Sequence, residues 1–390
     1  MATNAELVEL TSKYLIENYG RLPVAMARGR GAKIWDADGR EYIDFFAGFG
    51  GGGVTGHCHP KVVAAIKAQA ETLLSHGNLF TNAPQVELAR SITEHAFGGK
   101  VFFCHSGGEA GEAALKLVRL AAGEGRYKII SFNQCFHGRT MGTLSLTPER
   151  FQKGFKPMLP GSLQVDIGDV EAVRAAVDDE TAAVFVEPIQ GEGGVNIPSV
   201  EFMQGLRALC DEKGLLLVCD EVWTAPARTG KWFAYQHYDI APDVMVLAKA
   251  LGGGLPVGAC VAAPKWADVL GPGKHGCTMG GNPLCAAAGA ACMRLIEEED
   301  LVARAAETGR QIMDLVRGAG IGRVKDVRGK GMMIGIELDA PARDVFLAAM
   351  EGGLLVCYAG QSVLRLAPPL TIAADELSAG MDILIEVLKG

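Results

Sequence analysis

Residues 101–119 read VFFCHSGGEAGEAALKLVR, which is a short apolar run followed by two glycines and a stretch with helical spacing. Glycines between a strand and a helix expose backbone N–H groups at the positive end of the helix, and such a turn can hold a phosphate. A plain tight connection uses the same residues and is the commoner explanation for a single turn. The stretch therefore predicts a strand–turn–helix unit and leaves its ligand open.

The alternation of strands and helices extends outward from this stretch. Residues 5–18 have helical spacing, and residues 34–43 read as a hairpin that turns at residues 37–39. From residue 60 onward, helical stretches separate apolar runs that predict strands at 101–104, 128–132, 182–186, 215–219, 244–248 and 257–261. This order predicts an α/β fold with a mostly parallel sheet covered by helices on both faces.

The pattern changes after about residue 280. An alanine-rich helix is expected over 283–299, followed by strands at 332–338, 354–357 and 363–367 with helices between them. This part of the chain predicts a smaller α+β unit, because its strands and helices no longer alternate in the regular order seen before it.

The composition excludes several classes of protein. The 390 residues carry a net charge of −8, which is unlike a nucleic-acid-binding protein. No apolar run reaches the roughly 18 residues of a membrane span, and the first residues lack the pattern of a secretory signal. The ten cysteines form no Cys-x-x-Cys pair and lie mostly in or beside apolar runs, as in proteins of a reducing compartment. We therefore expect a cytoplasmic protein.

Two further strand ends carry ionisable residues. Asp220 and Glu221 follow the run 215–219, and Lys249 follows Ala248 at the end of another run. A carboxylate that closes a buried strand is costly without a cationic partner, although an exposed strand end or a helix cap is the commoner explanation for one aspartate. A lysine at this place can form a Schiff base if its pKa is lowered, and it can equally be a surface residue.

The three strand ends are more informative together, because ligands of open parallel sheets bind at the carboxyl ends of the strands. Pyridoxal phosphate requires a phosphate-binding turn, a carboxylate that keeps its pyridine nitrogen protonated and a lysine that holds its aldehyde. The turn at 105–108, Asp220 and Lys249 supply this set.

The chain resembles the class III, subgroup II, pyridoxal-phosphate-dependent aminotransferases over nearly its whole length, and within them the acetylornithine aminotransferases. The motifs that carry the resemblance include HCHP at 57–60, GNLF at 77–80, FHGRT at 136–140, EPIQGEGG at 187–194, DEV at 220–222, AKALGGG at 248–254, GGNP at 280–283 and RLAPPL at 365–370. The resemblance implies fold type I of the pyridoxal-phosphate-dependent transferases, with a large domain on a mostly parallel seven-stranded sheet and a smaller α+β domain. The implied division is an N-terminal segment 1–55 that belongs to the small domain, a large domain 56–280 and a C-terminal small domain 281–390.

The resemblance also implies roles for single residues. Lys249 resembles the Schiff-base lysine that also moves the proton, and Asp220 resembles the partner of the pyridine nitrogen; both are expected to be catalytic. Phe136 and Val222 are expected on the two faces of the cofactor ring. The implied cofactor-binding residues as a set are Gly107, Gly108, Phe136, His137, Asp220, Val222, Trp223, Lys249 and Thr278.

Thr278 is expected to reach the cofactor phosphate from the second subunit of a homodimer. Arg139 and Arg365 resemble residues that bind substrate carboxylates, a task that suits the bidentate guanidinium group. Glu192 resembles the acid that covers one arginine while an amino substrate is bound. No metal is expected, because the family's own loop accounts for the two histidines of HCHP.

Two places depart from the family pattern. Trp223 stands where the family usually has a glutamine that contacts the phenolic oxygen of the cofactor, and the stretch that follows has alanine and proline in place of glycines. Phe49 stands where ornithine aminotransferases have a tyrosine, which argues against free ornithine as the preferred donor. The run Gly50–Gly53 beside it is also unusual.

The expected function is transfer of the terminal amino group of N-acetylornithine to 2-oxoglutarate, giving N-acetylglutamate semialdehyde and glutamate in arginine biosynthesis. A related class III transaminase acting on succinylornithine, ornithine, 4-aminobutyrate or ω-amines is the first alternative, because the catalytic core is shared. A non-catalytic or nucleotide-binding protein is the second, although no Gly-x-Gly-x-x-Gly follows the first strand. The expected partners are the two substrates and a second subunit, with no nucleic acid and no membrane.

Overall fold

The computed structural model describes residues 2–47 and 54–390, so Phe49 and the run Gly50–Gly53 lie outside the described residues. Its largest sheet has seven strands in the order β4-β10-β9-β8-β7-β5-β6. The strands are β4 (Lys100–Cys104), β5 (Lys128–Phe132), β6 (Ser162–Val165), β7 (Thr181–Val186), β8 (Leu216–Asp220), β9 (Val244–Leu247) and β10 (Gly258–Ala262). Among the described strands of this sheet, β10 alone runs opposite to the others, which confirms the predicted mostly parallel sheet.

Helices cover both faces of this sheet, as predicted. Along β7, Val184 and Val186 pack in one core together with helix α8 (Val200–Lys213), whereas Ala183 and Phe185 pack in another with α4 (Gly107–Ala122). Successive side chains of a strand point to opposite faces, so the two cores lie on opposite sides of the sheet. Shorter helices connect the strands on this lobe: α5 (Met141–Leu146), α6 (Glu149–Gln152) and α7 (Val170–Ala176), with η1 (Ala234–Tyr238), η2 (Lys249–Gly252) and η3 (Pro264–Trp266).

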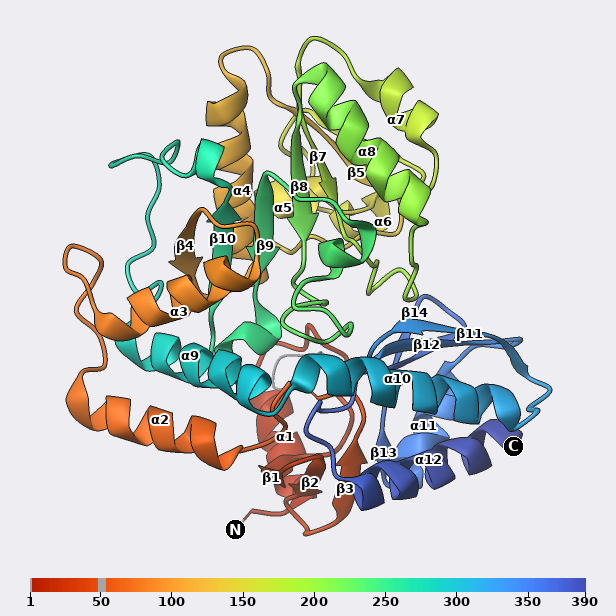
Figure 1. Ribbon diagram of the computed structural model, residues 1–390. Helices are drawn as coiled ribbons and strands as arrows, with labels where there is room; N and C mark the ends of the chain where they lie inside the picture. The colour runs from red at the N-terminus through yellow and green to blue at the C-terminus, as the bar shows by residue number, and fades with distance from the viewer. Residues whose placement is uncertain (1, 48–53) are drawn as a thin grey trace.

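The N-terminal and C-terminal parts of the chain share the second lobe, which lies below the large sheet in Figure 1. One sheet has the order β11-β12-β15-β14, and the other has the order β1-β2-β3-β13, in which β13 pairs parallel with β3. The strands are β1 (Met26–Arg30), β2 (Lys33–Asp36), β3 (Glu41–Asp44), β11 (Val324–Lys330), β12 (Met333–Leu338), β13 (Leu354–Leu355), β14 (Cys357–Ala359) and β15 (Val363–Leu366). The helices α10 (Leu301–Gly318), α11 (Arg343–Glu351) and α12 (Ala374–Lys389) pack with these sheets.

One helix belongs to the cores of both lobes. In α9 (Pro283–Glu298), Ala286 and Met293 pack in the core beneath the large sheet, whereas Leu295 and Ile296 pack in the core of the second lobe. Helices α2 (Pro60–Thr72) and α3 (Ala83–His95) pack against α9.

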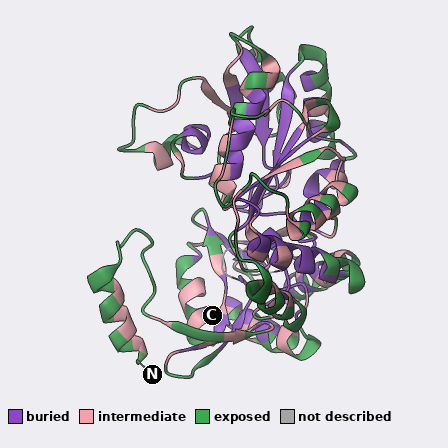
Figure 2. Cartoon of the chain, turned by 90° about the vertical axis from the view of Figure 1, so that its left-hand side faces the viewer, coloured by how far each residue is buried: buried purple, intermediate pink, exposed green. Residues whose placement is uncertain are grey.

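The first helix, α1 (Asn4–Tyr14), buries none of its residues against the rest of the chain. Figure 2 shows it in the colours of exposed and intermediate residues. The expectation of a helix through residue 18 is wrong, because Leu15 is already extended. No helix among the described residues combines the length and the apolar character of a membrane span.

Candidate active site

A cavity of about 710 Å³ opens at the carboxyl end of the large sheet. Its wall is made by residues that follow five of the seven strands, as the rule for open parallel sheets predicts. The lining residues are His57, His105, Ser106, Gly107, Gly108, Phe136, His137, Gly138, Glu187, Asp220, Val222, Trp223, Ala248, Lys249 and residues 254–257. The three strand ends singled out in the sequence thus meet in one cavity.

The turn after β4 presents the first backbone N–H groups of α4, and its glycines let a ligand come close to the backbone. The Ser106 hydroxyl accepts a hydrogen bond from the Glu109 N–H at 3.2 Å, and Gly107 and Gly108 are the first two residues of α4. A Cβ atom on Gly107 would lie 3.0 Å from a methyl group of Val222. The first N–H groups of a helix have no partner within the helix. The turn therefore has the donors and the space that a phosphate needs.

Asp220, at the end of β8, is paired with a buried histidine. Its Oδ2 lies 2.8 Å from Nδ1 of His137, and its Oδ1 accepts the N–H of Val222 at 3.1 Å. Burial works against a charged imidazole, but Cys135 and Asp220 raise the pKa of His137 well above its ordinary value. The pair holds a carboxylate at the cavity wall. His137, which was expected among the cofactor-binding residues, lines the cavity and also holds Asp220 by this contact.

Lys249, the first residue of η2 and two positions after β9, is a buried amine without an ion-pair partner in the described part of the chain. Its backbone φ of +45° lies in the left-handed region, which costs energy for a residue with a Cβ atom and is often found at functional sites. Burial lowers the pKa of Lys249 to about 8, although the charges of Asp220 and Glu192 oppose this change. Its Nζ lies 4.8 Å from the centre of the Trp223 ring.

Glu187, the first residue of the EPIQGEGG motif, is a site residue that was not predicted from the sequence. It follows β7 directly, lines the cavity and accepts N–H groups from Phe136 at 3.1 Å and from Gly191 at 3.3 Å. Burial raises the pKa of this carboxyl. Glu187 could have been predicted from the same feature as Asp220, because a carboxylate stands at the end of a buried strand in both places.

Arg365, on β15, reaches the site from the second lobe. Its Nη1 lies 3.0 Å from Oε1 of Glu192, and the Trp223 indole N–H donates to the same oxygen at 3.3 Å. The guanidinium carbon lies 4.3 Å from the centre of the Trp223 ring. Arg365 is fully buried, whereas the Glu192 side chain is 28% exposed. The predicted pairing of these two residues therefore exists in this structure, with Trp223 in contact with both.

Four expected site residues do not line the cavity. Glu192 and Arg365 contact Trp223, which does line it. Arg139 is exposed and its guanidinium lies against the rings of Phe136 and Phe151, at 5.2 and 4.8 Å from their centres. Thr278 is exposed in the segment between η3 and α9 and does not line the cavity of its own chain.

The chain belongs to the class III aminotransferases, since residues 14–388 match the model of the family described as aminotransferase class III. An acetylornithine aminotransferase of Methanopyrus kandleri is 47% identical over 387 residues, which cover 98% of each chain. One of Caldanaerobacter subterraneus subsp. tengcongensis is 44% identical over 98% of this chain and 99% of its own. The crystal structure of the ornithine aminotransferase from Toxoplasma gondii ME49 matches with a TM-score of 0.94 and 35% identity, over 100% of this chain and 95% of that one. The resemblance read from the sequence and the fold it implied are confirmed.

Pyridoxal phosphate is the cofactor of this family, and the residues of the cavity fit it. A glycine turn at the start of a helix, a carboxylate held by His137 and a buried lysine without an ion-pair partner in the described chain converge on one cavity. These are the groups that the phosphate, the pyridine nitrogen and the aldehyde of the cofactor need.

Proposed function

We propose that this chain transfers the terminal amino group of N-acetylornithine to 2-oxoglutarate, giving N-acetylglutamate semialdehyde and glutamate in arginine biosynthesis. The observation that carries the proposal is the ion pair between Arg365 and Glu192, whose atoms lie 3.0 Å apart. The Trp223 ring lies against both Arg365 and Lys249. Near-full-length identity of 42–47% to several acetylornithine aminotransferases supports it.

The residues of the cavity divide the work of binding the cofactor. Gly107 and Gly108 would hold the phosphate through backbone N–H groups. Asp220, held by its contact with His137, would bind the pyridine nitrogen as a charge-assisted partner. When bound, pyridoxal phosphate supplies an electrophilic aldehyde and an electron sink for the electrons released at the substrate carbon.

Lys249 would hold and then move the proton. Because burial lowers its pKa to about 8, an appreciable share of its amine is neutral near neutral pH. A neutral amine can take a proton from the carbon that carries the substrate amino group as a general base, and the ammonium group so formed can give that proton back as a general acid.

The Arg365–Glu192 pair would let one site accept two differently shaped substrates. 2-Oxoglutarate has two carboxylates, whereas N-acetylornithine presents one carboxylate and an amide and reacts at the far end. A buried arginine left without a counter-ion is costly. Glu192 covers Arg365 while the amine donor is bound and leaves it free for a carboxylate of 2-oxoglutarate.

A steady-state panel of amino donors with 2-oxoglutarate as acceptor tests the assignment. We expect N-acetylornithine to give the highest kcat/KM among N-acetylornithine, N-succinylornithine, ornithine, 4-aminobutyrate and a simple ω-amine. A higher value for ornithine would instead support the alternative that the similarity to the Toxoplasma gondii ornithine aminotransferase favours.

We also propose that the chain is a cytoplasmic homodimer. Thr278 is exposed and outside its own cavity, and the apolar side chains of Leu79, Phe80 and Met279 are 95%, 72% and 50% exposed, which suits a surface covered by a second subunit. The ten cysteines are all free, which fits a reducing compartment. The division into residues 1–55, 56–280 and 281–390 is part of the same proposal, supported by the two cores that meet along α9.

A further inference from the structure

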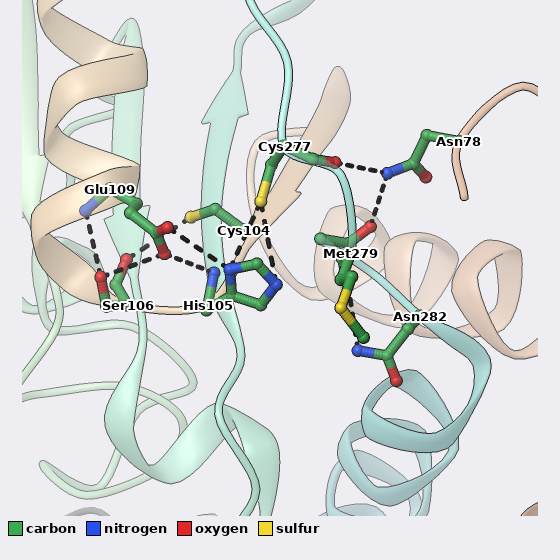
Figure 3. A network of polar contacts seen from close by, with 9 residues as sticks. Asn78, Cys104, His105, Ser106, Glu109, Cys277, Met279 and Asn282 are labelled. Atoms are coloured by element: carbon green, nitrogen blue, oxygen red, sulfur yellow. Dashed lines mark hydrogen bonds and ion pairs between the residues drawn. The ribbon is translucent and has the colours of Figure 1, made fainter. Parts of the chain in front are cut away.

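Three side chains with metal-binding atoms converge beside the cavity. His105 follows β4, Glu109 lies in the first turn of α4, and Cys277 comes from the segment before α9. The His105 Nδ1 lies 3.3 Å from Glu109 Oε1 and 3.4 Å from Cys277 Sγ. One ligand atom from each residue lies within 4.8 Å of the others. Figure 3 shows the imidazole between the carboxylate and the thiol.

The two separations from the His105 Nδ1 match those of a tetrahedral metal site, and the Glu109 and Cys277 atoms lie within 4.8 Å of each other. Zinc binds nitrogen, oxygen and sulfur at about 2.0–2.3 Å, which places neighbouring ligand atoms of a tetrahedron about 3.3–3.8 Å apart. Without a metal, the imidazole contacts the carboxylate through Nδ1, and the sulfur lies 3.4 Å from Nδ1 and 3.9 Å from Nε2. A cation between the three groups would satisfy all of them.

Separate contacts hold each ligand in place. The Oε2 of Glu109 accepts a hydrogen bond from the backbone N–H of His105 at 2.8 Å, and its Oε1 faces the imidazole of His105. The carbonyl of Cys277 accepts the Asn78 side-chain amide at 2.8 Å, which fixes the segment that carries the thiol. Such supporting bonds orient metal ligands and raise affinity.

We propose that His105, Glu109 and Cys277 bind one Zn²⁺ ion, with the fourth position open to water. An imidazole with a thiolate favours zinc over magnesium or calcium, which prefer oxygen ligands alone. On binding, the thiol of Cys277 releases its proton to water, and the thiolate and the carboxylate together balance the charge of the ion. The ion would join the turn that carries Gly107 to the segment that carries Thr278. The proposal does not depend on which amino donor the enzyme uses.

Zinc titration of the holoenzyme tests the site. The protein is treated with a chelator, dialysed and titrated with Zn²⁺ alone, and bound metal is counted by elemental mass spectrometry. We expect one zinc per chain and a higher Tm with zinc. The variants Cys277→Ser and His105→Asn should each bind at least tenfold more weakly. Cobalt as a probe should give visible bands of tetrahedral cobalt in the wild type that Cys277→Ser lacks.

The matched control is Cys58→Ser, which removes an exposed thiol that lies between His57 and His59. It should keep the wild-type stoichiometry and affinity. Loss of zinc in Cys58→Ser alone, equal binding in wild type and Cys277→Ser, or no stoichiometric binding would each overturn the proposal. If Cys277→Ser does not fold, as judged by circular dichroism, Glu109→Gln replaces it, because it removes a ligand charge and keeps an oxygen that can still accept the bonds at the helix start.

Discussion

At the scale of single residues, Lys249 gives the sharpest expectation for pH. A pKa lowered to about 8 means that the neutral amine becomes the main form as pH rises through 8, whereas an ordinary lysine reaches this point only near 10.5. The rate at which cofactor-free protein captures pyridoxal phosphate should therefore rise up to about pH 8 and then level off. Stopped-flow absorbance measures this rate, and a rise that continues to pH 10 would contradict the lowered pKa. Lys249→Ala, the control, should fold, capture no cofactor covalently and transfer no amino group.

Asp220→Asn removes a charge from the pair with His137. A charge-assisted hydrogen bond contributes about 1.5–3 kcal/mol, so we expect kcat to fall at least tenfold while the cofactor is retained. The control is Glu221→Gln on the neighbouring residue, whose pKa burial raises to about 7 and which binds the N–H groups of Ala234 and Tyr235 instead of lining the cavity. That variant should keep kcat. An unchanged kcat in Asp220→Asn would assign the pyridine nitrogen to another group.

Trp223 contacts more of the site than the sequence suggested. From the sequence, Trp223 was expected only to replace the glutamine that contacts the cofactor in the family. In the structure, its indole N–H donates to Glu192, and its ring faces Arg365 and Lys249. Trp223→Phe removes the N–H and keeps an aromatic ring. Since one hydrogen bond contributes about 1 kcal/mol, we expect a roughly fivefold loss in the amine-donor half-reaction and little change with 2-oxoglutarate.

Single-turnover measurements of each half-reaction decide the role of Trp223. Glu192→Gln serves as the comparison, because it removes the charge that Trp223 helps to place; it should also weaken the amine-donor half more than the other half. Equal losses in both halves for either variant would mean that the Arg365–Glu192 pair does not distinguish the two substrates.

At the scale of elements, the position of α4 depends on a glycine in a neighbouring strand. A Cβ atom on Gly258, the first residue of β10, would lie 2.3 Å from the carbonyl oxygen of Ser106, which caps α4. Gly258→Ala should displace the turn at Gly107 and weaken pyridoxal-phosphate binding at least tenfold. An absorbance titration of cofactor-free protein measures the dissociation constant. Gly322→Ala, where nothing lies within 4 Å, is the control, and wild-type affinity in both variants would refute the expectation.

The sequence predicted most elements of the large lobe, because its central strands are continuous runs of buried apolar residues. Each of the six predicted strands lies within one residue of an observed strand. The strand β6 was missed, since it lies at the sheet edge and all four of its residues are only partly buried. Helix α1 ends before the predicted residue 18, and none of its residues is buried, so little packing stabilises a further turn.

In the candidate site, too, residues with a local sequence signal could be predicted, whereas contacts that depend on packing could not. Asp220 and Lys249 could be found because a strand end shows itself in the local sequence. The pairing of Arg365 with Glu192 joins residues 173 positions apart from two lobes, so only the family resemblance suggested it. The hydrogen bond between Trp223 and Glu192 had no signal in the sequence, because it depends on how the turns after β7 and β8 pack together.

At the scale of the whole molecule, the exposed Thr278 makes a test of the dimer possible. If Thr278 serves the cavity of the second subunit, a mixed dimer of Lys249→Ala and Thr278→Ala chains has one site with both residues intact. Mixing the two variants should therefore create sites with wild-type cofactor affinity, up to one per dimer, although neither variant has them alone. Refolded mixtures, assayed at limiting pyridoxal phosphate, give the readout. If Thr278 served its own chain, mixing would restore nothing.

The pairing of β3 with β13 has a consequence for synthesis of the chain. Contacts in this region, such as that between Arg40 and the carbonyl of Met350, join residues 310 positions apart. At about 5–20 residues per second, the first strands to leave the ribosome wait roughly 15–60 s for the strand that completes their sheet. Ile43 and Phe45, buried in the finished protein, stay uncovered during this time, while the large sheet already has all its strands once residue 262 has emerged. The beginning of the chain is therefore among the last parts to be covered by the rest of the fold.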